Sequence, residues 1–175
     1  MRESYFQGEW IKSWRHHYPK CHIVKIPDMP KTAGSRFLPP KPYDFYAILD
    51  GKTYAMELKL KTKLGGFAFD DVTEWQVNNL LEAQVNGALA YIVINYRVSG
   101  ITPRQQKGNG LVVKRINRVF IIDIRDFVAL DKSLNSRSIP FKTLLGHMGH
   151  ENGFYQIEKN GDHWDVPKMV ENSHE

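Results

Sequence analysis

The sequence has a single cysteine, Cys21, so no disulfide can form within the chain. It has no apolar run near the roughly 20 residues that a membrane-spanning helix requires. The opening stretch MRESYFQGEW lacks the apolar core of a secretory signal peptide. Internal repeats and low-complexity tracts are also missing. These absences exclude a disulfide scaffold, and they predict a protein that folds in a reducing cytoplasm and has no membrane partner.

Acidic residues are scarce in two long segments of the chain. From Trp10 to Lys41 the only acidic residue is Asp28, and between Ala83 and Ile122 there is none. The basic residues of these segments are Lys12, Arg15, Lys20, Lys25, Lys31, Arg36, Lys41, Arg97, Arg104, Lys107, Lys114, Arg115 and Arg118. Such segments favour a polyanionic partner, with nucleic acid as the leading candidate. The alternative is a solubilising surface whose counter-charges lie elsewhere.

The length and composition indicate one globular unit. The chain has 175 residues, of which 42% are hydrophobic and 25% charged, and its formal net charge is +5. This size suits one compact domain with one sizeable core. We therefore expect a single domain over residues 1–175, with a core formed by about residues 1–130. Residues 131–175 are expected to add short helices and a hairpin, and the sequence assigns them no role.

Hydrophobic periodicity predicts the main elements. Apolar residues four apart, at Phe6, Trp10 and Trp14, indicate a first helix. A second helix is expected to begin at Thr73, which has capping-box spacing to Gln76. The other expected elements are strands at 21–26, 43–49, 53–61, 88–96 and 117–124, a basic loop at 102–110, short helices at 125–133 and 140–148, and a hairpin at 155–166.

This order of elements predicts an α/β fold in which helices flank a mixed β-sheet. The unit of residues 53–96, strand then helix then strand, is expected to form a right-handed parallel crossover.

The stretch YAMELKLKT, residues 54–62, carries the first candidate catalytic groups. Strand periodicity places Glu57 and Lys59 together on one face, opposite the apolar set. The Asp-Gly-Lys turn before it predicts a hairpin in which paired residue numbers sum to about 102. Asp44 is then expected opposite Leu58, within reach of the Glu-x-Lys pair.

Two neighbouring carboxylates suit a hard cation. Mg²⁺ takes oxygen ligands and usually needs few from the protein. Asp44 and Glu57 would supply carboxylates, and the carbonyl of Leu58 would be a third ligand. Lys59 would offset the repulsion between the carboxylates, and orient the attacking water or stabilise charge on the phosphate. The alternative without function is a strand with one solvent-exposed face, on which these residues form an ion pair across the turn.

At this point the residues match a known pattern. The run Pro42-Tyr43-Asp44-Phe45, followed by Glu57-Leu-Lys59, resembles the signature of PD-(D/E)XK nucleases. The Pro-x-Asp-Phe form is most similar to RecU-type Holliday-junction resolvases, and the archaeal Hjc-type resolvases are a second match. The literal Pro-Asp dipeptide is absent. The resemblance extends from the first helix to about Ile124 and implies a restriction-endonuclease-like fold.

The resemblance also implies two further site residues. The family uses a Glu on the first helix as a metal ligand, and Glu9 stands at the corresponding place. It carries a Gln on the helix after the Glu-x-Lys strand, and Gln76 fits that position. The alternatives are a solvated Glu on an amphipathic helix and a simple capping-box partner. Trp75, which precedes Gln76, is expected to belong to the core and not to contact the substrate.

A long loop is expected at residues 27–42, where RecU-type proteins carry a stalk that enters the junction. The resemblance implies that Lys31, Arg36 and Lys41 bind phosphates there and that Phe37 stacks on a base. The alternative is a surface loop without this role. Further DNA-binding residues expected from the charge pattern are Arg104, Lys107, Lys114 and Arg115.

The function that we expect is a Mg²⁺-dependent endonuclease, with Mn²⁺ as a substitute, which resolves four-way DNA junctions. One site cuts one strand, so paired symmetric nicks imply a homodimer. The resemblance implies products with a 5′-phosphate and a 3′-hydroxyl, in the cytoplasm of a bacterial, archaeal or phage-infected cell. Two other functions stay open: a restriction-like or repair nuclease on duplex or flap DNA, and a non-catalytic DNA-binding module.

Overall fold

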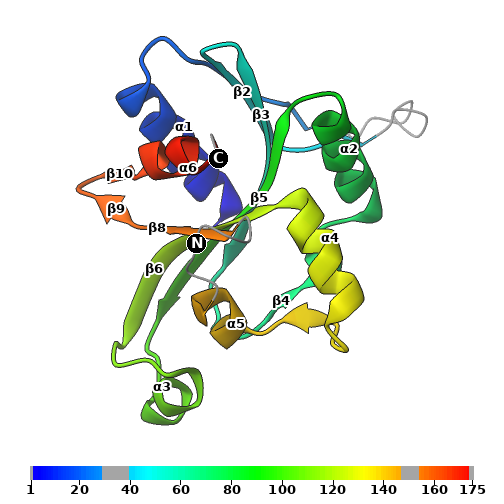
Figure 1. Cartoon of the computed structure of the whole chain (residues 1–175). Coiled ribbons are helices and arrows are strands. Elements are labelled where there is room, and N and C mark those ends of the chain that lie inside the picture. The colour runs from blue at the N-terminus through cyan, green and yellow to red at the C-terminus, as the bar shows by residue number, and fades with distance from the viewer. Residues whose placement is uncertain (1, 29–39, 147–153, 174–175) are drawn as a thin grey trace, which may run out of the picture.

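A six-stranded sheet runs through the protein (Figure 1). The computed structural model describes residues 2–28, 40–146 and 154–173. The helices are α1 (Glu3–His17), α2 (Glu74–Val85), α3 (Pro103–Asn109), α4 (Ile124–Ser133), α5 (Phe141–Gly146) and α6 (Val166–Asn172), with a 3₁₀ turn at Phe69–Asp71. The strands are β1 (His22–Lys25), β2 (Phe45–Leu49), β3 (Lys52–Lys61), β4 (Phe67–Ala68), β5 (Leu89–Ser99), β6 (Arg115–Asp123), β7 (Ser138–Ile139), β8 (Phe154–Ile157), β9 (Lys159–Asn160) and β10 (His163–Trp164). Within these described residues, no helix is long and apolar enough to cross a membrane.

The strand order in the central sheet is β1-β2-β3-β5-β6-β8. β3 and β5 run parallel, with α2 between them in the chain, and the other neighbouring pairs are antiparallel. Two small pairs, β4–β7 and β9–β10, lie outside this sheet. The predicted α/β fold, a mixed sheet flanked by helices, is therefore confirmed, including the parallel pairing of the two strands around α2.

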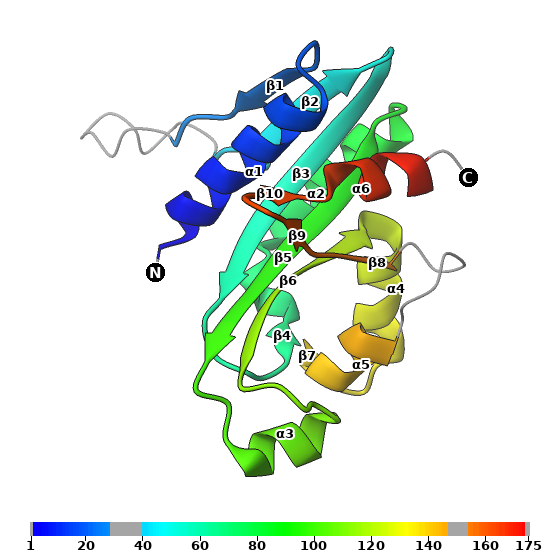
Figure 2. The ribbon, with the colours of Figure 1, turned by 90° about the vertical axis from the view of Figure 1, so that its left-hand side faces the viewer.

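Helices cover both faces of the sheet, so it has two separate cores. On one face α1 and α6 pack over Tyr54, Met56 and Leu58 of β3. On the other face α2 and α4 pack over alternate residues such as Ala55 and Ile92. Figures 1 and 2 show α1 and α6 on the side of the sheet opposite α2 and α4. Period-two alternation along β3 thus decides which helix each side chain meets.

A tight turn sets the register of the β2–β3 hairpin. Asp50 and Gly51 both have positive φ, 49° and 77°, as a two-residue type I′ turn requires. Phe45 pairs with Met56, so paired numbers sum to 101. The predicted register was one residue off, and Asp44 follows next to Glu57 instead of opposite Leu58. This shift puts the two carboxylates on the same face of the hairpin.

Two segments differ from the expected elements. The basic segment 102–110 was predicted as a loop, but it forms helix α3 with a capping box between Thr102 and Gln105. It stands at the far end of the β5–β6 hairpin, beyond the rest of the sheet (Figure 2). The expected hairpin at 155–166 is shorter, with β9 and β10 as its strands, because β8 joins the edge of the central sheet.

Candidate active site

Two buried carboxylates lie side by side on the β2–β3 hairpin. Asp44 and Glu57 are each 1% exposed. The N–H of Leu58 donates to Oδ2 of Asp44 over 2.9 Å. Nζ of Lys41 lies 2.6 Å from Oδ1 of Asp44, and Nζ of Lys59 lies 2.9 Å from Oε1 of Glu57. The hairpin thus gathers two acids and two ammonium groups, because the turn fixes the register and β3 alternates its faces.

Helix α2 completes this cluster through Gln76. Oε1 of Gln76 accepts from the N–H of Thr73 over 3.1 Å, which closes the capping box at the start of α2. Its Nε2 donates to Oε1 of Glu57 over 2.6 Å. The Gln76 side chain therefore closes the cap with its oxygen and binds the Glu57 carboxylate with its nitrogen. Oε2 of Glu57 is buried and has no hydrogen-bond partner in the described part of the chain.

Burial shifts the pKa of Glu57 far above that of an exposed glutamate. Desolvation raises the pKa of its carboxyl to about 7, and the neighbouring charge of Asp44 adds to the increase. Lys59 and Lys41 act in the opposite direction without cancelling it. Because two carboxylates in a low-dielectric site resist simultaneous ionisation, the pair favours either a proton or a cation between them.

Glu3, at the start of α1, lies beside Lys59 at the edge of this cluster. Burial raises the pKa of its carboxyl, and the charges that act on it include those of Lys59 and Asp44. It lines a shallow hollow together with Lys59, Leu60, Lys61, Phe67 and Asp71. No pattern in the sequence favours Glu3 as a site residue, because it lies at the exposed start of the helix, before the apolar stripe begins at Phe6.

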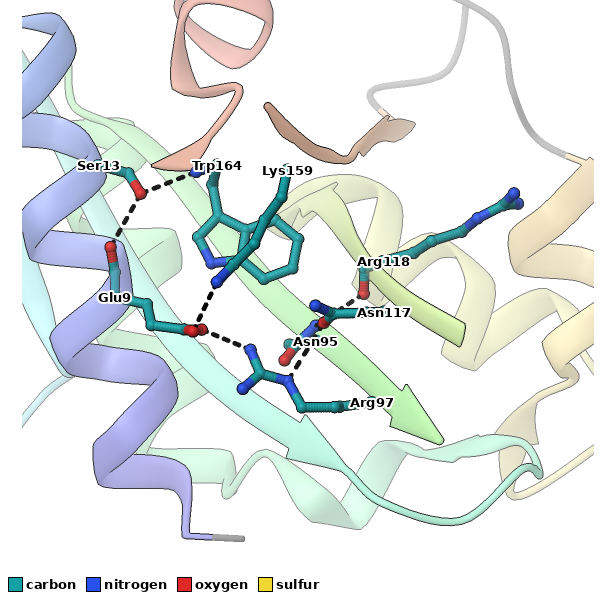
Figure 3. Close-up of polar contacts among 8 residues, drawn as sticks. All are labelled: Glu9, Ser13, Asn95, Arg97, Asn117, Arg118, Lys159 and Trp164. Carbon is teal, nitrogen blue, oxygen red and sulfur yellow. Dashed lines mark hydrogen bonds and ion pairs between the residues drawn. The ribbon is translucent and has the colours of Figure 1, made fainter. Parts of the chain in front are cut away.

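Glu9, the predicted α1 ligand, lies in a different cluster. Its Oε1 is 2.6 Å from Nζ of Lys159, and its Oε2 pairs with the guanidinium of Arg97. Nε of Arg97 also donates to Oδ1 of Asn117, as Figure 3 shows. α1 packs on the face of the sheet opposite Glu57, so the structure does not bring Glu9 together with Asp44 and Glu57.

The predicted DNA-binding residues fall into three groups. Lys31, Arg36 and Phe37 lie outside the described residues. Lys41 belongs to the carboxylate cluster. The remaining four are exposed on α3, on the chain that follows it and at the start of β6: Arg104, Lys107, Lys114 and Arg115. Exposed beside them are Val112 and Val113, so the end of the β5–β6 hairpin combines four cations with an apolar tip.

The donor set can be tested against the expected divalent cation. Across residues 2–28, 40–146 and 154–173, no group of three or more His, Cys, Asp or Glu side chains is arranged as a metal site. Asp44 and Glu57 therefore stand as a pair of carboxylates, which suits Mg²⁺ because that ion retains several waters. Oε2 of Glu57, buried and without a hydrogen-bond partner among the described residues, leaves one acceptor of the pair for such an ion. The residues fit such an ion.

Trp75 contradicts the expectation that it belongs to the core. Its side chain is 42% exposed, and its Nε1 donates to the carbonyl of Pro40 over 3.0 Å. Pro40 directly precedes the Lys41 that pairs with Asp44. The first turn of α2 is therefore tied both to the carboxylate cluster, through Gln76, and to the chain leading into it, through Trp75.

Comparisons with known proteins place few constraints on this chain. No protein-family model matches the sequence, and no curated protein matches it. Among solved structures, the chain is similar to Archaeoglobus fulgidus Hjc, a Holliday junction resolvase from an archaeal hyperthermophile, with a TM-score of 0.41 and 15% identity. The similarity covers 72% of this chain and 75% of that chain. So weak a likeness carries no weight for function, which has to be inferred from the chain's own residues.

Proposed function

We propose that the chain is a divalent-metal-dependent endonuclease that cuts branched DNA. The observation that carries the proposal is the buried pair Asp44 and Glu57, with the ammonium of Lys59 2.9 Å from Glu57. Carboxylates beside a lysine on one hairpin are what phosphodiester hydrolysis with Mg²⁺ or Mn²⁺ needs. The sequence resemblance to RecU-type resolvases suggests a four-way junction as the substrate. Paired nicks in a junction need two sites, which is why we propose a homodimer.

Each residue of the cluster has a defined task in this proposal. Asp44 and Glu57 would hold the cation, with the carbonyl of Leu58 as the expected third ligand. When bound, the cation supplies Lewis acidity and a more acidic water. Lys59 would orient the attacking water or stabilise the charge that develops on the phosphate. Gln76 fixes the carboxylate of Glu57 from the first turn of α2.

The substrate is tested by comparing a synthetic four-way junction with a linear duplex of matched sequence. We expect Mg²⁺-dependent paired nicks in the junction, at symmetric positions, and little cutting of the duplex. Equal cutting of the junction and the duplex would favour a restriction-like or repair nuclease over a resolvase. Binding without any cutting, unaffected by Mg²⁺, would favour a non-catalytic DNA-binding module.

The two acidic residues of α1 are expected to behave differently. Glu3→Gln should weaken Mn²⁺ binding by about tenfold, because Glu3 lies beside Lys59 at the edge of the cluster. Glu9→Gln should leave Mn²⁺ binding unchanged but lower the free energy of unfolding by about 1–3 kcal/mol, since Lys159 and Arg97 lose their counter-charge. Calorimetric Mn²⁺ titration and urea unfolding of both variants separate these roles. Weaker Mn²⁺ binding in Glu9→Gln but not in Glu3→Gln would indicate that Glu9 belongs to the metal site after all.

The exposed cations around α3 are expected to bind DNA phosphates. Replacing Arg104, Lys107, Lys114 and Arg115 together with Ala should reduce the salt dependence of DNA binding, by about 0.9 in log–log slope for each phosphate that is no longer neutralised. The loss of affinity should be similar for junction and duplex, since phosphate contacts carry no sequence information. Fluorescence anisotropy at several salt concentrations measures the slope. Lys132→Ala, an exposed lysine on α4, is the control, and an unchanged slope in the quadruple variant would exclude this surface.

A further inference from the structure

Lys41 bridges two carboxylates of very different exposure. Its Nζ lies 2.6 Å from Oδ1 of Asp28 and 2.6 Å from Oδ1 of Asp44. The Asp28 side chain is 72% exposed, whereas that of Asp44 is 2% exposed. Lys41 itself is only 20% exposed. A single ammonium therefore stands between a solvated acid and the buried acid that the proposed function assigns to metal binding.

Both oxygens of Asp44 are engaged in this arrangement. Oδ2 accepts from the N–H of Leu58, and Oδ1 receives the ammonium of Lys41. A buried carboxylate needs such a counter-charge, because an unpaired charge away from water is strongly unfavourable. A divalent cation that binds Asp44 supplies the same compensation with twice the charge. The lysine and the cation would then repel each other across one carboxylate.

Asp28 offers Lys41 a second carboxylate partner. Asp28 lies within contact of Lys41 and remains available when Asp44 takes another cation. Moving the ammonium from Asp44 to Asp28 needs no residue outside the present contacts. Lys59, in contrast, pairs with Glu57 itself. The two lysines are therefore not equivalent.

We propose that Lys41 is a resident counter-ion which competes with the divalent cation for Asp44 and is held by Asp28 when the cation is bound. Lys41 thereby acts as a positioning residue: it sets the metal affinity through Asp44 and keeps that buried acid compensated before metal arrives. The inference rests on the proposed function, in which Asp44 is a metal ligand. By thermodynamic reciprocity, metal must weaken the Lys41–Asp44 pair as much as Lys41 weakens metal binding.

The test is Mn²⁺ binding to the full chain without DNA, measured by calorimetry and by electron paramagnetic resonance. Lys41→Met should bind Mn²⁺ more tightly than the wild type, by on the order of tenfold, a usual size for coupling between two competing ligands. Lys41→Arg keeps the charge and should stay near the wild-type affinity. Lys61→Met removes an equal charge that pairs with Asp71 beside the cluster, and it should have little effect. Wild-type or weaker affinity in Lys41→Met would overturn the inference.

A second variant covers the case in which Lys41→Met folds poorly. Asp28→Asn alters an exposed side chain and leaves Lys41 with Asp44 as its remaining partner in the cluster. It should therefore weaken Mn²⁺ binding severalfold. Asp71→Asn removes a carboxylate that pairs with Lys61 instead of Lys41, and it should leave the Mn²⁺ affinity near the wild-type value. Equal losses in Asp28→Asn and Asp71→Asn would show general electrostatics and refute the competition.

The failure of the inference can be distinguished from failure of the proposed function. Asp44→Asn should abolish specific Mn²⁺ binding if the site is where we place it. Normal Mn²⁺ binding in Asp44→Asn would refute the metal site and the competition together. Abolished binding in Asp44→Asn, combined with an unaltered affinity in Lys41→Met, would refute the competition alone.

Discussion

Asp44→Asn is expected to lower the rate of Mg²⁺-dependent junction cleavage by more than about 100-fold. Loss of a residue that only supports a metal ligand usually has a smaller effect. Glu57→Gln should have an effect of the same order. The reason is structural: the two buried side chains are the adjacent carboxylates of the hairpin, and each amide removes one of two charges that would hold the cation. Single-turnover nicking of a labelled four-way junction measures the loss.

The matched control for this result is Asp71→Asn. Asp71 pairs with Lys61 over 3.0 Å, close to the cluster but without contact to Asp44 or Glu57. This variant should cleave at nearly the wild-type rate. Asp44→Asn should still bind the junction in Ca²⁺ or EDTA, because the residues proposed to bind phosphates are others. Undiminished cleavage by Asp44→Asn would show that cleavage does not depend on this carboxylate and would refute the proposed site.

The hairpin that carries the proposed site could be predicted because its signals are local. The Asp50-Gly51 turn joins two strands whose alternation is visible in the sequence, and it brings Asp44 to Glu57. The register was missed by one residue, since the turn has two central residues and its centre falls between them. Gln76 could also be predicted, because the capping box that orients it lies within one helical turn.

The partners of α1 could not be predicted in the same way. The apolar stripe shows which side of the helix is buried, and Trp10 and Trp14 are indeed fully buried. It does not show which end of the helix lies near the hairpin. Lys159, which pairs with Glu9, is 150 residues away in the sequence. The packing of β10 and α6 against α1 brings the C-terminal segment, and with it Lys159, to Glu9.

The prediction of a loop at residues 102–110 was wrong for a different reason, because the signals for helix α3 were present in the sequence. Thr102 and Gln105 have capping-box spacing, Pro103 suits the first helical turn, and Gly110 ends the helix with φ of 65°. The concentration of glycine and positive charge nevertheless suggested a loop. Weighing cap chemistry above composition would have identified this helix.

Glu57 should give the ligand-free protein a distinctive pH dependence. Its pKa is raised from 4.5 to about 7, so between these values the folded protein keeps a proton that the unfolded chain has lost. The free energy of unfolding therefore falls as pH rises through this window. The stabilisation from the neutral form is complete below pH 4.5 and lost above about pH 7. A shift of this size corresponds to about 3 kcal/mol for Glu57 alone.

Glu57→Gln removes that dependence, because its amide stays neutral at every pH. In EDTA the variant should match the wild type near the unfolded pKa of 4.5 and become the more stable protein as pH rises above 7. Urea unfolding at both pH values measures the difference. Glu82→Gln, an exposed glutamate on α2, is the control and should follow the wild type. Parallel pH profiles for Glu57→Gln and the wild type would contradict the raised pKa.

The same proton should compete with metal. Below pH 7 a divalent cation can bind Glu57 only after its carboxyl has lost the proton, so Mn²⁺ affinity should fall by about tenfold for each pH unit below that value. Calorimetry in buffers of different ionisation enthalpy should detect about one proton released for each Mn²⁺ bound near pH 6. Affinity that does not change over this range, with no proton release, would mean that Glu57 does not ligate the cation.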